Sequence, residues 1–539
     1  MKPTILLAAS LIPTATVAMM PCSKKAFNKI LPSNSTTLYA VEVPEGGTFE
    51  VASDLSYPTN ATNLPALCAV AFNVTSSSSS SFTFGIFLPK QWSKRLFTAG
   101  NGGFAGGINW LSMAEGLEEG FACVSTDTGH NVSDTNDGTW AYNAPEKIKD
   151  WTGRALHSSV QQAKTIVSAY YGSDAKYSYY SGCSTGGYQG LKEVQTYPED
   201  FDGVLVGSPA WWHSHLQTWS IQVALWNQPS DAPYHIPDSL FSVIGAEVMN
   251  QCDGADGVLD GIISAPKSCD FHPEALLCTS PAADKSECLT APQVELLYNL
   301  YNNWYEGNNE FVFPQYSYGS EFQWSMLSSG TEESGFSEQF AKYIMYQNPE
   351  WTVANFSYQT VLDAERVCKS VGLDADNFDL TPFHHKQGKL LHYVGLADGL
   401  IPPGSSEYYH NHVVQTMAPQ GVNVTDFYRL FTIPGMGHCA YTSSSSKAPW
   451  YINGASQAGS LGTGVRGVPG YQDAGHDALR ALIKWVEEDV GPNKIVATKY
   501  KNDNVEDGVL QQRPLCVYPG RATFRGGDMT KPENWYCEN

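Results

Sequence analysis

The stretch from residue 177 to residue 207 constrains the fold more than any other feature of the chain. Residues 177–180 form an aromatic, strand-like run, residues 189–195 are helix-like, and residues 203–207 form a short buried-strand run. Strand, helix and strand in this order are typical of a parallel sheet covered by helices on both faces. We therefore predict an α/β fold.

The turn between that first strand and the helix carries a glycine-flanked serine, Gly182-Cys183-Ser184-Thr185-Gly186. Because a serine hydroxyl is a poor nucleophile, hydrolases place it on a sharp strand-to-helix turn, where the next backbone N–H can face a developing oxyanion. The two glycines allow that turn without side-chain clashes. The pattern makes Ser184 a candidate nucleophile; the alternative is a glycine-rich turn with a solvated serine.

Composition excludes several classes of protein. The 539 residues suffice for a large core, in one domain with an insertion or in two to three modest ones. Hydrophobic residues make up 42% and charged residues 16%, so the chain is globular. The formal net charge of −22 would repel nucleic acid and anionic membranes, so we expect neither as a partner.

Three features predict secretion. Lys2 and an apolar run over residues 5–17 precede small residues, so residues 1–18 are expected to form a signal peptide cleaved near Ala18. No later run reaches the length of a membrane span. The 12 cysteines suit disulfides in an oxidising compartment. Six glycosylation sequons occur, at Asn34, Asn60, Asn73, Asn131, Asn355 and Asn423.

Further elements are expected on both sides of a long irregular segment. Residues 19–80 are predicted to be a strand-rich entry tied by Cys22 and Cys68. After residue 488 we expect loop with little regular structure, held by Cys516 and Cys537. The other predicted elements are strands at 82–89, 95–99, 121–126, 389–395 and 428–433 and helices at 155–171, 405–416 and 473–488.

The strand and helix rhythm breaks between residues 210 and 383. Long insertions into a hydrolase sheet usually cover the active site and vary specificity. Its tryptophans could stack on an aromatic substrate or could simply be core; they are Trp211, Trp212, Trp219 and Trp226.

An acid and a base follow the two strands after the insertion. Asp398 comes just past the strand at 389–395, and His438 lies on a glycine-rich loop after the strand at 428–433. The order Ser184, Asp398, His438 is that of α/β-hydrolases. Alternatively, Asp398 is a turn acid and His438 a loop histidine. Of the other candidates, Asp127 has the wrong order and His392 lies inside a strand, while His384, His385, His410 and His412 lack a carboxylate at metal-ligand spacing.

A glycine cluster at residues 100–107 follows the strand at 95–99. No Gly-Lys-Ser/Thr follows it, so it is not a phosphate-binding loop. In a serine hydrolase of the α/β type this position supplies one oxyanion-hole N–H, and the residue after the nucleophile supplies the other. We assign these roles to Gly103 and Thr185, with Gly102 nearly as good as Gly103; a flexible glycine turn is the alternative.

Two cysteines adjoin the proposed nucleophile and base. Cys183 precedes Ser184 and Cys439 follows His438. If they are bonded, the disulfide joins the turn of the nucleophile to the loop of the base and so sets their separation, to which reaction rate is sensitive.

Taken together, these motifs resemble the tannase and feruloyl esterase family. The matching residues are Gly182-Cys183-Ser184-Thr185-Gly186-Gly187, Asp398 at its strand end, and Gly435-Met436-Gly437-His438-Cys439. The resemblance implies an α/β-hydrolase fold, with residues 19–209 and 384–539 as the catalytic domain and residues 210–383 as a lid. It also implies secreted hydrolysis of phenolic acid esters.

Within that family, Thr185-Gly186-Gly187 is more similar to the feruloyl branch, so we expect feruloyl esters of plant cell-wall polysaccharides as substrates, with galloyl esters as the alternative. A catalytically silent binding protein on the same fold would be a different class, but such a protein would normally lack a triad member. We expect a monomer or a homodimer.

The family resemblance further implies a calcium site in the lid. The matching loop runs from residue 253 to 262, and the implied ligands are the carboxylates of Asp253, Asp256 and Asp260 and the carbonyls of Val258 and Ile262. An ordinary Asp/Gly turn is the alternative. Two disulfides are expected to brace this region, Cys252 with Cys269 and Cys278 with Cys288, which leaves Cys123 and Cys368 without an assigned partner.

Overall fold

The computed structural model describes residues 19–51, 54–280, 284–307, 309–325 and 335–538. The predicted signal peptide therefore lies outside the described residues. Among the residues that are described, no helix combines the length and the apolar character needed to cross a membrane.

A nine-stranded sheet forms the centre of the molecule, with the strand order β1-β4-β5-β7-β6-β8-β9-β12-β13. In this order, the six strands β7, β6, β8, β9, β12 and β13 are parallel to one another, while β1, β4 and β5 form an antiparallel extension. Their bounds are β1 (Ser35–Val43), β4 (Leu67–Thr75), β5 (Ser81–Pro89), β6 (Arg95–Ala99), β7 (Ala122–Thr126), β8 (Tyr177–Cys183), β9 (Gly203–Gly207), β12 (Lys389–Gly395) and β13 (Tyr428–Ile433).

Both faces of this sheet are buried, which confirms the predicted α/β class. Successive side chains of a strand point to opposite faces. In β12, Leu390 and Val394 join the core on one face, whereas Leu391 and Tyr393 join the core on the other. The helices outside the insertion are α1 (Lys24–Phe27), α2 (Trp110–Leu117), α3 (Pro145–Lys149), α4 (Ala155–Tyr171), α5 (Thr185–Thr196), α13 (Pro403–Met417), α14 (Ala458–Leu461) and α15 (Ala478–Glu488).

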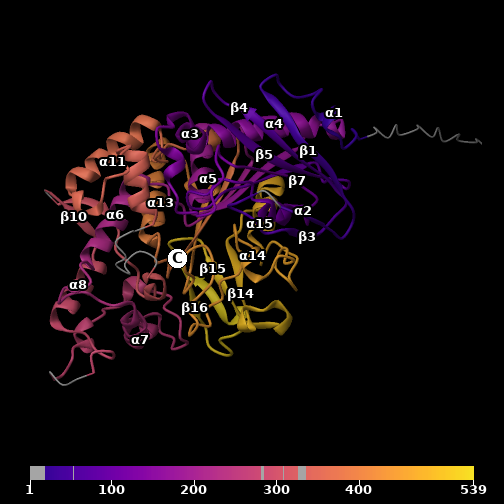
Figure 1. The fold of residues 1–539 in the computed structure, drawn as a ribbon. Helices are drawn as coiled ribbons and strands as arrows, with labels where there is room; N and C mark the ends of the chain where they lie inside the picture. The colour runs from indigo at the N-terminus through magenta and orange to yellow at the C-terminus, as the bar shows by residue number, and fades with distance from the viewer. Residues whose placement is uncertain (1–18, 52–53, 281–283, 308, 326–334, 539) are drawn as a thin grey trace, which may run out of the picture.

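Residues 210–383, which we call the insertion, lie between β9 and β12 and are mainly helical (Figure 1). Its apolar side chains form one continuous core with the adjoining sheet face. Trp211 and Trp219 belong to that core, while Trp212 and Trp226 are partly buried against it. The elements of the insertion are α6 (His213–Trp226), α7 (Phe241–Cys252), α8 (Ala291–Leu300), β10 (Trp304–Glu306), β11 (Glu310–Phe313), α10 (Phe336–Gln339), α11 (Tyr358–Val371) and α12 (Thr381–His385).

The prediction for the C-terminal residues was wrong. Instead of loop, the chain after α15 forms β14 (Lys494–Tyr500) paired with β15 (Val509–Cys516), and β16 (Arg521–Phe524) paired with β17 (Trp535–Glu538). Ile495, Ala497 and Leu515 are buried in the core of the second sheet face, so tertiary packing stabilises strands that isolated sequence patterns do not reveal. A further small sheet pairs β2 (Gly47–Phe49) with β3 (Ala61–Leu64).

The last helix also starts later than expected, at Ala478 instead of residue 473. The carboxylate of Asp477 accepts a hydrogen bond from the N–H of Arg480, 2.9 Å away, and so caps the helix at this point.

All five predicted disulfides form, and the two unassigned cysteines, Cys123 and Cys368, are buried free thiols. The bonded pairs are Cys22 with Cys68, Cys183 with Cys439, Cys252 with Cys269, Cys278 with Cys288, and Cys516 with Cys537.

Candidate active site

Ser184 occupies a strained turn between β8 and α5. Its backbone has φ 61° and ψ −121°, a conformation that residues with a β-carbon rarely adopt. The turn is held on both sides, since the Ser184 N–H donates to the Gly207 carbonyl at 3.0 Å and the Ser184 carbonyl accepts from Ala210 N–H at 3.0 Å. A β-carbon at Gly186 would lie 2.6 Å from the Asn101 carbonyl, so this close approach requires glycine.

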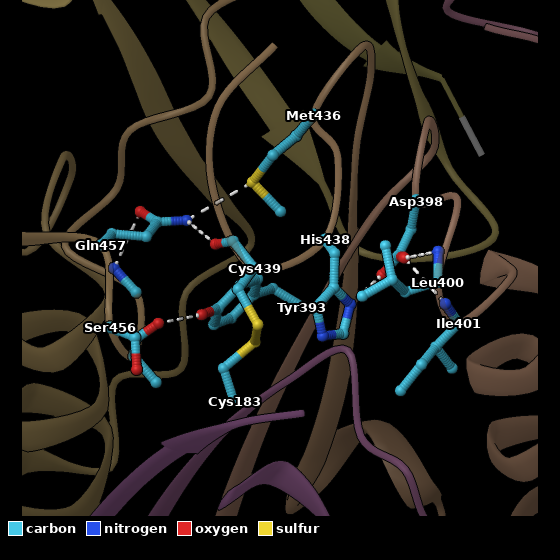
Figure 2. The surroundings of a disulfide bond; sticks show 12 residues. Cys183, Tyr393, Asp398, Leu400, Ile401, Met436, His438, Cys439, Ser456 and Gln457 are labelled. Atoms are coloured by element: carbon cyan, nitrogen blue, oxygen red, sulfur yellow. Dashed lines mark hydrogen bonds and ion pairs between the residues drawn. A yellow bond between two sulfur atoms is a disulfide. The ribbon is translucent and has the colours of Figure 1, made fainter. Parts of the chain in front are cut away.

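His438 and Asp398 lie in hydrogen-bond contact, as expected from their positions after the adjacent parallel strands β12 and β13. His438 Nδ1 lies 2.9 Å from Asp398 Oδ2 (Figure 2). Asp398 is fully buried, and its other oxygen accepts from the backbone N–H groups of Leu400 and Ile401 at 3.0 and 2.9 Å. A carboxylate held in this way accepts a hydrogen bond from the Nδ1–H of the imidazole and leaves Nε2 as the basic nitrogen.

The Cys183–Cys439 disulfide joins the serine turn to the histidine loop. The two Cα atoms are 6.0 Å apart, and each cysteine is the direct chain neighbour of Ser184 or His438. Figure 2 shows the His438 ring with this disulfide on one side and Asp398 on the other. Gln457, which is fully buried, donates from its amide to the Cys439 carbonyl at 3.1 Å and so supports the loop.

Gln323 of the insertion joins two loops: the loop that carries Asp398, here called the acid loop, and the loop that carries His438, here called the base loop. Its Oε1 accepts hydrogen bonds from the backbone N–H of Gly399 at 3.0 Å and of His438 at 2.9 Å. Sequence reasoning missed both Gln323 and Gln457, because a single glutamine in an irregular segment carries no pattern. Gln323 lies in a short turn that also contains Glu321, which is buried. Burial raises the pKa of Glu321, and a hydrogen bond from the Tyr301 hydroxyl acts in the opposite direction.

The glycine cluster after β6 lies against the serine turn, as the contact between Asn101 and Gly186 shows. The Gly102 N–H already donates to the Tyr57 hydroxyl at 2.8 Å. Among the described residues, none accepts a hydrogen bond from the backbone N–H of Gly103 or of Thr185. Of the two glycines, Gly103 is therefore the one whose donor is free.

Two other candidates have structural partners away from this pair. Asp127 accepts hydrogen bonds from Thr83 and Gly129. His392 is fully buried and bonds to the hydroxyls of Tyr428 and Ser406, and burial lowers its pKa to about 3. Neither side chain has Ser184 among its hydrogen-bond partners.

The aspartate loop of the insertion provides unpaired oxygens. Asp256 Oδ2 and Asp260 Oδ1 are buried without a hydrogen-bond partner, while Asp253 accepts from the backbone N–H groups of Gly261 and Ile262. The other Asp260 oxygen forms an ion pair with Arg513. Burial raises the pKa of Asp260, and the Arg513 guanidinium partly offsets this rise. Within the described residues, the three aspartates do not form a group of oxygens all within 4.8 Å of one another.

Comparison with known proteins identifies the family. The model of the family described as "Tannase and feruloyl esterase" matches residues 68–538. The chain belongs to the tannase and feruloyl esterase family. Members of this family are carboxylic ester hydrolases, so the chain is an enzyme of that class.

Similar members of the family cover nearly the whole chain. "Probable feruloyl esterase B-1" of Aspergillus oryzae is 35% identical over 475 residues, 88% of this chain and 84% of the relative. "Probable feruloyl esterase B-2" of Aspergillus terreus is 33% identical over 518 residues, 95% of this chain and 94% of the relative.

Solved structures of the family have the same fold. The crystal structure of feruloyl esterase B from Aspergillus oryzae superposes with a TM-score of 0.87 at 33% identity, covering 96% of this chain and 99% of that one. Tannin acyl hydrolase from Aspergillus niger shares the fold with a TM-score of 0.75 at 22% identity, covering 96% of each chain.

The two hydrogen bonds that Gln323 accepts from Gly399 and His438, here called the glutamine clamp, should be needed for full activity but not for folding of the core. Gln323→Ala leaves two backbone donors unpaired, at a cost of about 1–3 kcal/mol each when they stay buried. We expect kcat for ester hydrolysis to fall by about 100-fold, the effect of a misplacement of about 1 Å. Phe322→Ala, at an adjacent side chain that is 38% exposed, is the matched control and should keep kcat. Full activity of Gln323→Ala in a steady-state assay would contradict the clamp.

Proposed function

We propose that this chain is a feruloyl esterase that hydrolyses hydroxycinnamic esters of plant cell-wall polysaccharides through an acyl-serine intermediate. The observation that carries the proposal is the 2.9 Å hydrogen bond between His438 and Asp398, on a histidine loop that the Cys183–Cys439 disulfide links to the Ser184 turn. The feruloyl esterase B names of similar family members support the choice of acyl group.

In the proposed reaction, Ser184 Oγ attacks the ester carbonyl while His438 Nε2 takes its proton. Asp398 holds the imidazole orientation and stabilises the imidazolium. The tetrahedral intermediate then collapses when His438 returns the proton to the departing alcohol, which leaves the acyl group on Ser184. Water then attacks the acyl carbonyl while His438 takes a proton from it. The second tetrahedral intermediate collapses as His438 returns this proton to Ser184 Oγ, which releases the acid and restores the serine.

The oxyanion of both tetrahedral intermediates would be stabilised by the N–H groups of Gly103 and Thr185. Both donors are free of other acceptors among the described residues, and Thr185 begins α5, whose N-terminal end favours negative charge.

A hydrolysis panel tests the substrate assignment. Methyl ferulate, caffeate, p-coumarate, sinapate and gallate are compared by kcat/KM, and we expect ferulate or another hydroxycinnamate to be preferred. A preference for methyl gallate would instead indicate a tannase. Labelling by a serine-directed phosphonate separates either enzyme from a catalytically silent binding protein, which would not react.

We further propose that the aspartate loop holds a structural calcium ion. Two buried carboxylate oxygens without partners, on Asp256 and Asp260, suit a cation that prefers hard oxygen ligands. Asp253 and the carbonyls of Val258 and Ile262 would complete the ligand set from the same loop. The Cys252–Cys269 disulfide closes this loop and would limit its motion.

Calcium removal should therefore destabilise the protein. At a free calcium concentration about 100 times Kd, binding adds about 2.7 kcal/mol to the free energy of unfolding, which chelation removes. We expect chelation to lower Tm of the wild type and of Asp270→Asn, a control whose side chain is 94% exposed just outside the loop. Asp256→Asn should have a lower Tm than the wild type in the presence of calcium, and chelation should lower its Tm by less. Identical melting with and without chelator in the wild type would refute the site.

Secretion and glycosylation are proposed on separate grounds. Five disulfides persist in oxidising compartments and not in the cytosol. The sequon asparagines are exposed except Asn73, which is half-buried. Glycosidase treatment followed by mass measurement would identify the occupied sequons.

A further inference from the structure

A second polar cluster lies at the end of α5 opposite to Ser184. It consists of His157 on α4, Glu193 in the last turn of α5, and Asp200 in the connection to β9. One ligand atom of each residue lies within 4.8 Å of the others, and among the described residues this is the one such group. Glu193 follows Ser184 by nine residues, about 13 Å along the helix, so the cluster is separate from the proposed catalytic residues.

Glu193 lacks the partners that a buried carboxylate needs. The residue is 1% exposed, and neither side-chain oxygen accepts a hydrogen bond from an amide, amine or hydroxyl donor. Burial, the charge of Asp200 and a carboxyl-to-carboxylate contact with Asp200 together raise the pKa of Glu193 well above its usual range. A carboxyl with a raised pKa keeps its proton while no cation is bound, and a bound cation would replace that proton as the counter-charge of Glu193.

The other two residues are oriented toward the same point. Asp200, also 1% exposed, has Oδ2 2.6 Å from His157 Nδ1. The His157 ring stacks on Tyr197 with centroids 3.7 Å apart, which sets its direction. Its side chain is 30% exposed, so the cluster has an edge open to solvent through which an ion could enter.

The local charge favours a cation. The side chains facing the two carboxylates are His157, Gln161, which donates to Asp200, and Lys164, whose Nζ is 3.9 Å from Asp200 Oδ1. Among the described residues, Lys164 is the one lysine or arginine in ion-pair distance of these two carboxylates, so two acidic groups share a single ammonium.

We propose that His157, Glu193 and Asp200 form a binding site for a divalent transition metal of the zinc type. One imidazole nitrogen and two carboxylates, with water in the fourth position, are a ligand set that zinc accepts, whereas calcium prefers six to eight oxygens. Binding displaces two protons, the Nδ1 proton between His157 and Asp200 and the proton of the Glu193 carboxyl, and both pass to solvent. The ion would join α4 to the end of the helix that begins at the nucleophile, and its role is structural.

Zinc titration of the full chain tests the proposal. Calcium stays in the buffer to occupy the aspartate loop, and bound zinc is counted by calorimetry, with Co²⁺ absorbance as a check for a nitrogen ligand. We expect one zinc per wild-type chain and a higher Tm with zinc. In Glu193→Gln and His157→Asn, the affinity for zinc should fall by at least about tenfold. Mutating a residue that only supports a metal ligand already costs about that much, and these two residues would be ligands themselves.

His476→Asn is the matched control, because His476 also bonds to an aspartate, Asp473, at 3.0 Å but on the surface and without a third ligand. It should bind zinc like the wild type, and the rate of ester hydrolysis should be unchanged in all three variants. Absence of saturable zinc binding to the wild type would overturn the site, as would wild-type affinity in both cluster variants. Folding of Glu193→Gln is checked by its Tm without zinc, and His157→Asn, at a partly exposed ring, provides a second variant.

Discussion

Replacing Ser184 by alanine is expected to lower kcat for methyl ferulate by about a million-fold, the loss measured when a triad serine is removed from a serine hydrolase. Alanine keeps the β-carbon, so the strained backbone at φ 61° and the packing of the turn are preserved. What disappears is the atom that forms the acyl-enzyme. Steady-state kinetics and phosphonate labelling measure this loss directly.

The matched control is Ser181→Ala, three residues earlier in β8, where the serine is buried at 7% exposure and has no proposed role in the reaction. It should retain both kcat and labelling. If Ser184→Ala were as active as Ser181→Ala, the acyl-serine mechanism would be wrong.

Ser184→Gly offers a further check on the strain at the nucleophile. Glycine tolerates this backbone conformation, so relief of strain of about 1–3 kcal/mol should outweigh the entropy loss of about 0.5–1 kcal/mol that glycine adds. We expect an inactive protein with a higher Tm than Ser184→Ala. Such a result would show that the turn is kept strained for catalysis at the expense of stability.

Removing the Cys183–Cys439 disulfide is expected to have the second largest effect. The bond closes a separation of 256 residues, for which chain entropy gives about 5 kcal/mol of stabilisation. Cys183→Ala/Cys439→Ala should therefore lower Tm. It should also lower kcat by about 100-fold in the fraction that remains folded, because the serine turn and histidine loop lose their covalent link. Thermal unfolding and kcat below the transition measure the two effects separately.

Cys516→Ala/Cys537→Ala is the control for this double variant. That bond closes a separation of 21 residues between β15 and β17 and should contribute about 3 kcal/mol, yet it joins neither catalytic loop. We expect Tm to fall while kcat stays at the wild-type value. Equal losses of kcat in both double variants would mean that the Cys183–Cys439 bond acts only through stability.

Most of the sheet could be predicted from local pattern. The strands at residues 95–99, 203–207, 389–395 and 428–433 have the predicted bounds, because each is a compact apolar run that ends at a turn or at glycine. The C-terminal strands could not be predicted in this way. Their burial depends on a sheet face contributed by residues far away in the sequence, and Pro514 interrupts the strand pattern of β15.

The two supporting glutamines show a different limit. Gln323 reaches Gly399 and His438 across separations of 76 and 115 residues, and Gln457 reaches Cys439 across 18. Such contacts depend on how loops fold against each other, and no spacing rule connects their residues.

The sequence by itself determined the α/β class and the order of Ser184, Asp398 and His438, because strand periodicity and strand-end positions are local properties. The pairing of the cysteines was an expectation that the tertiary structure confirmed. Only the tertiary structure decided that Gln323 binds the acid loop to the base loop and that the Gly102 donor is already used. It also brought His157, Glu193 and Asp200 together. These outcomes depend on distances between segments that chain order does not specify, since each is set by packing across the core.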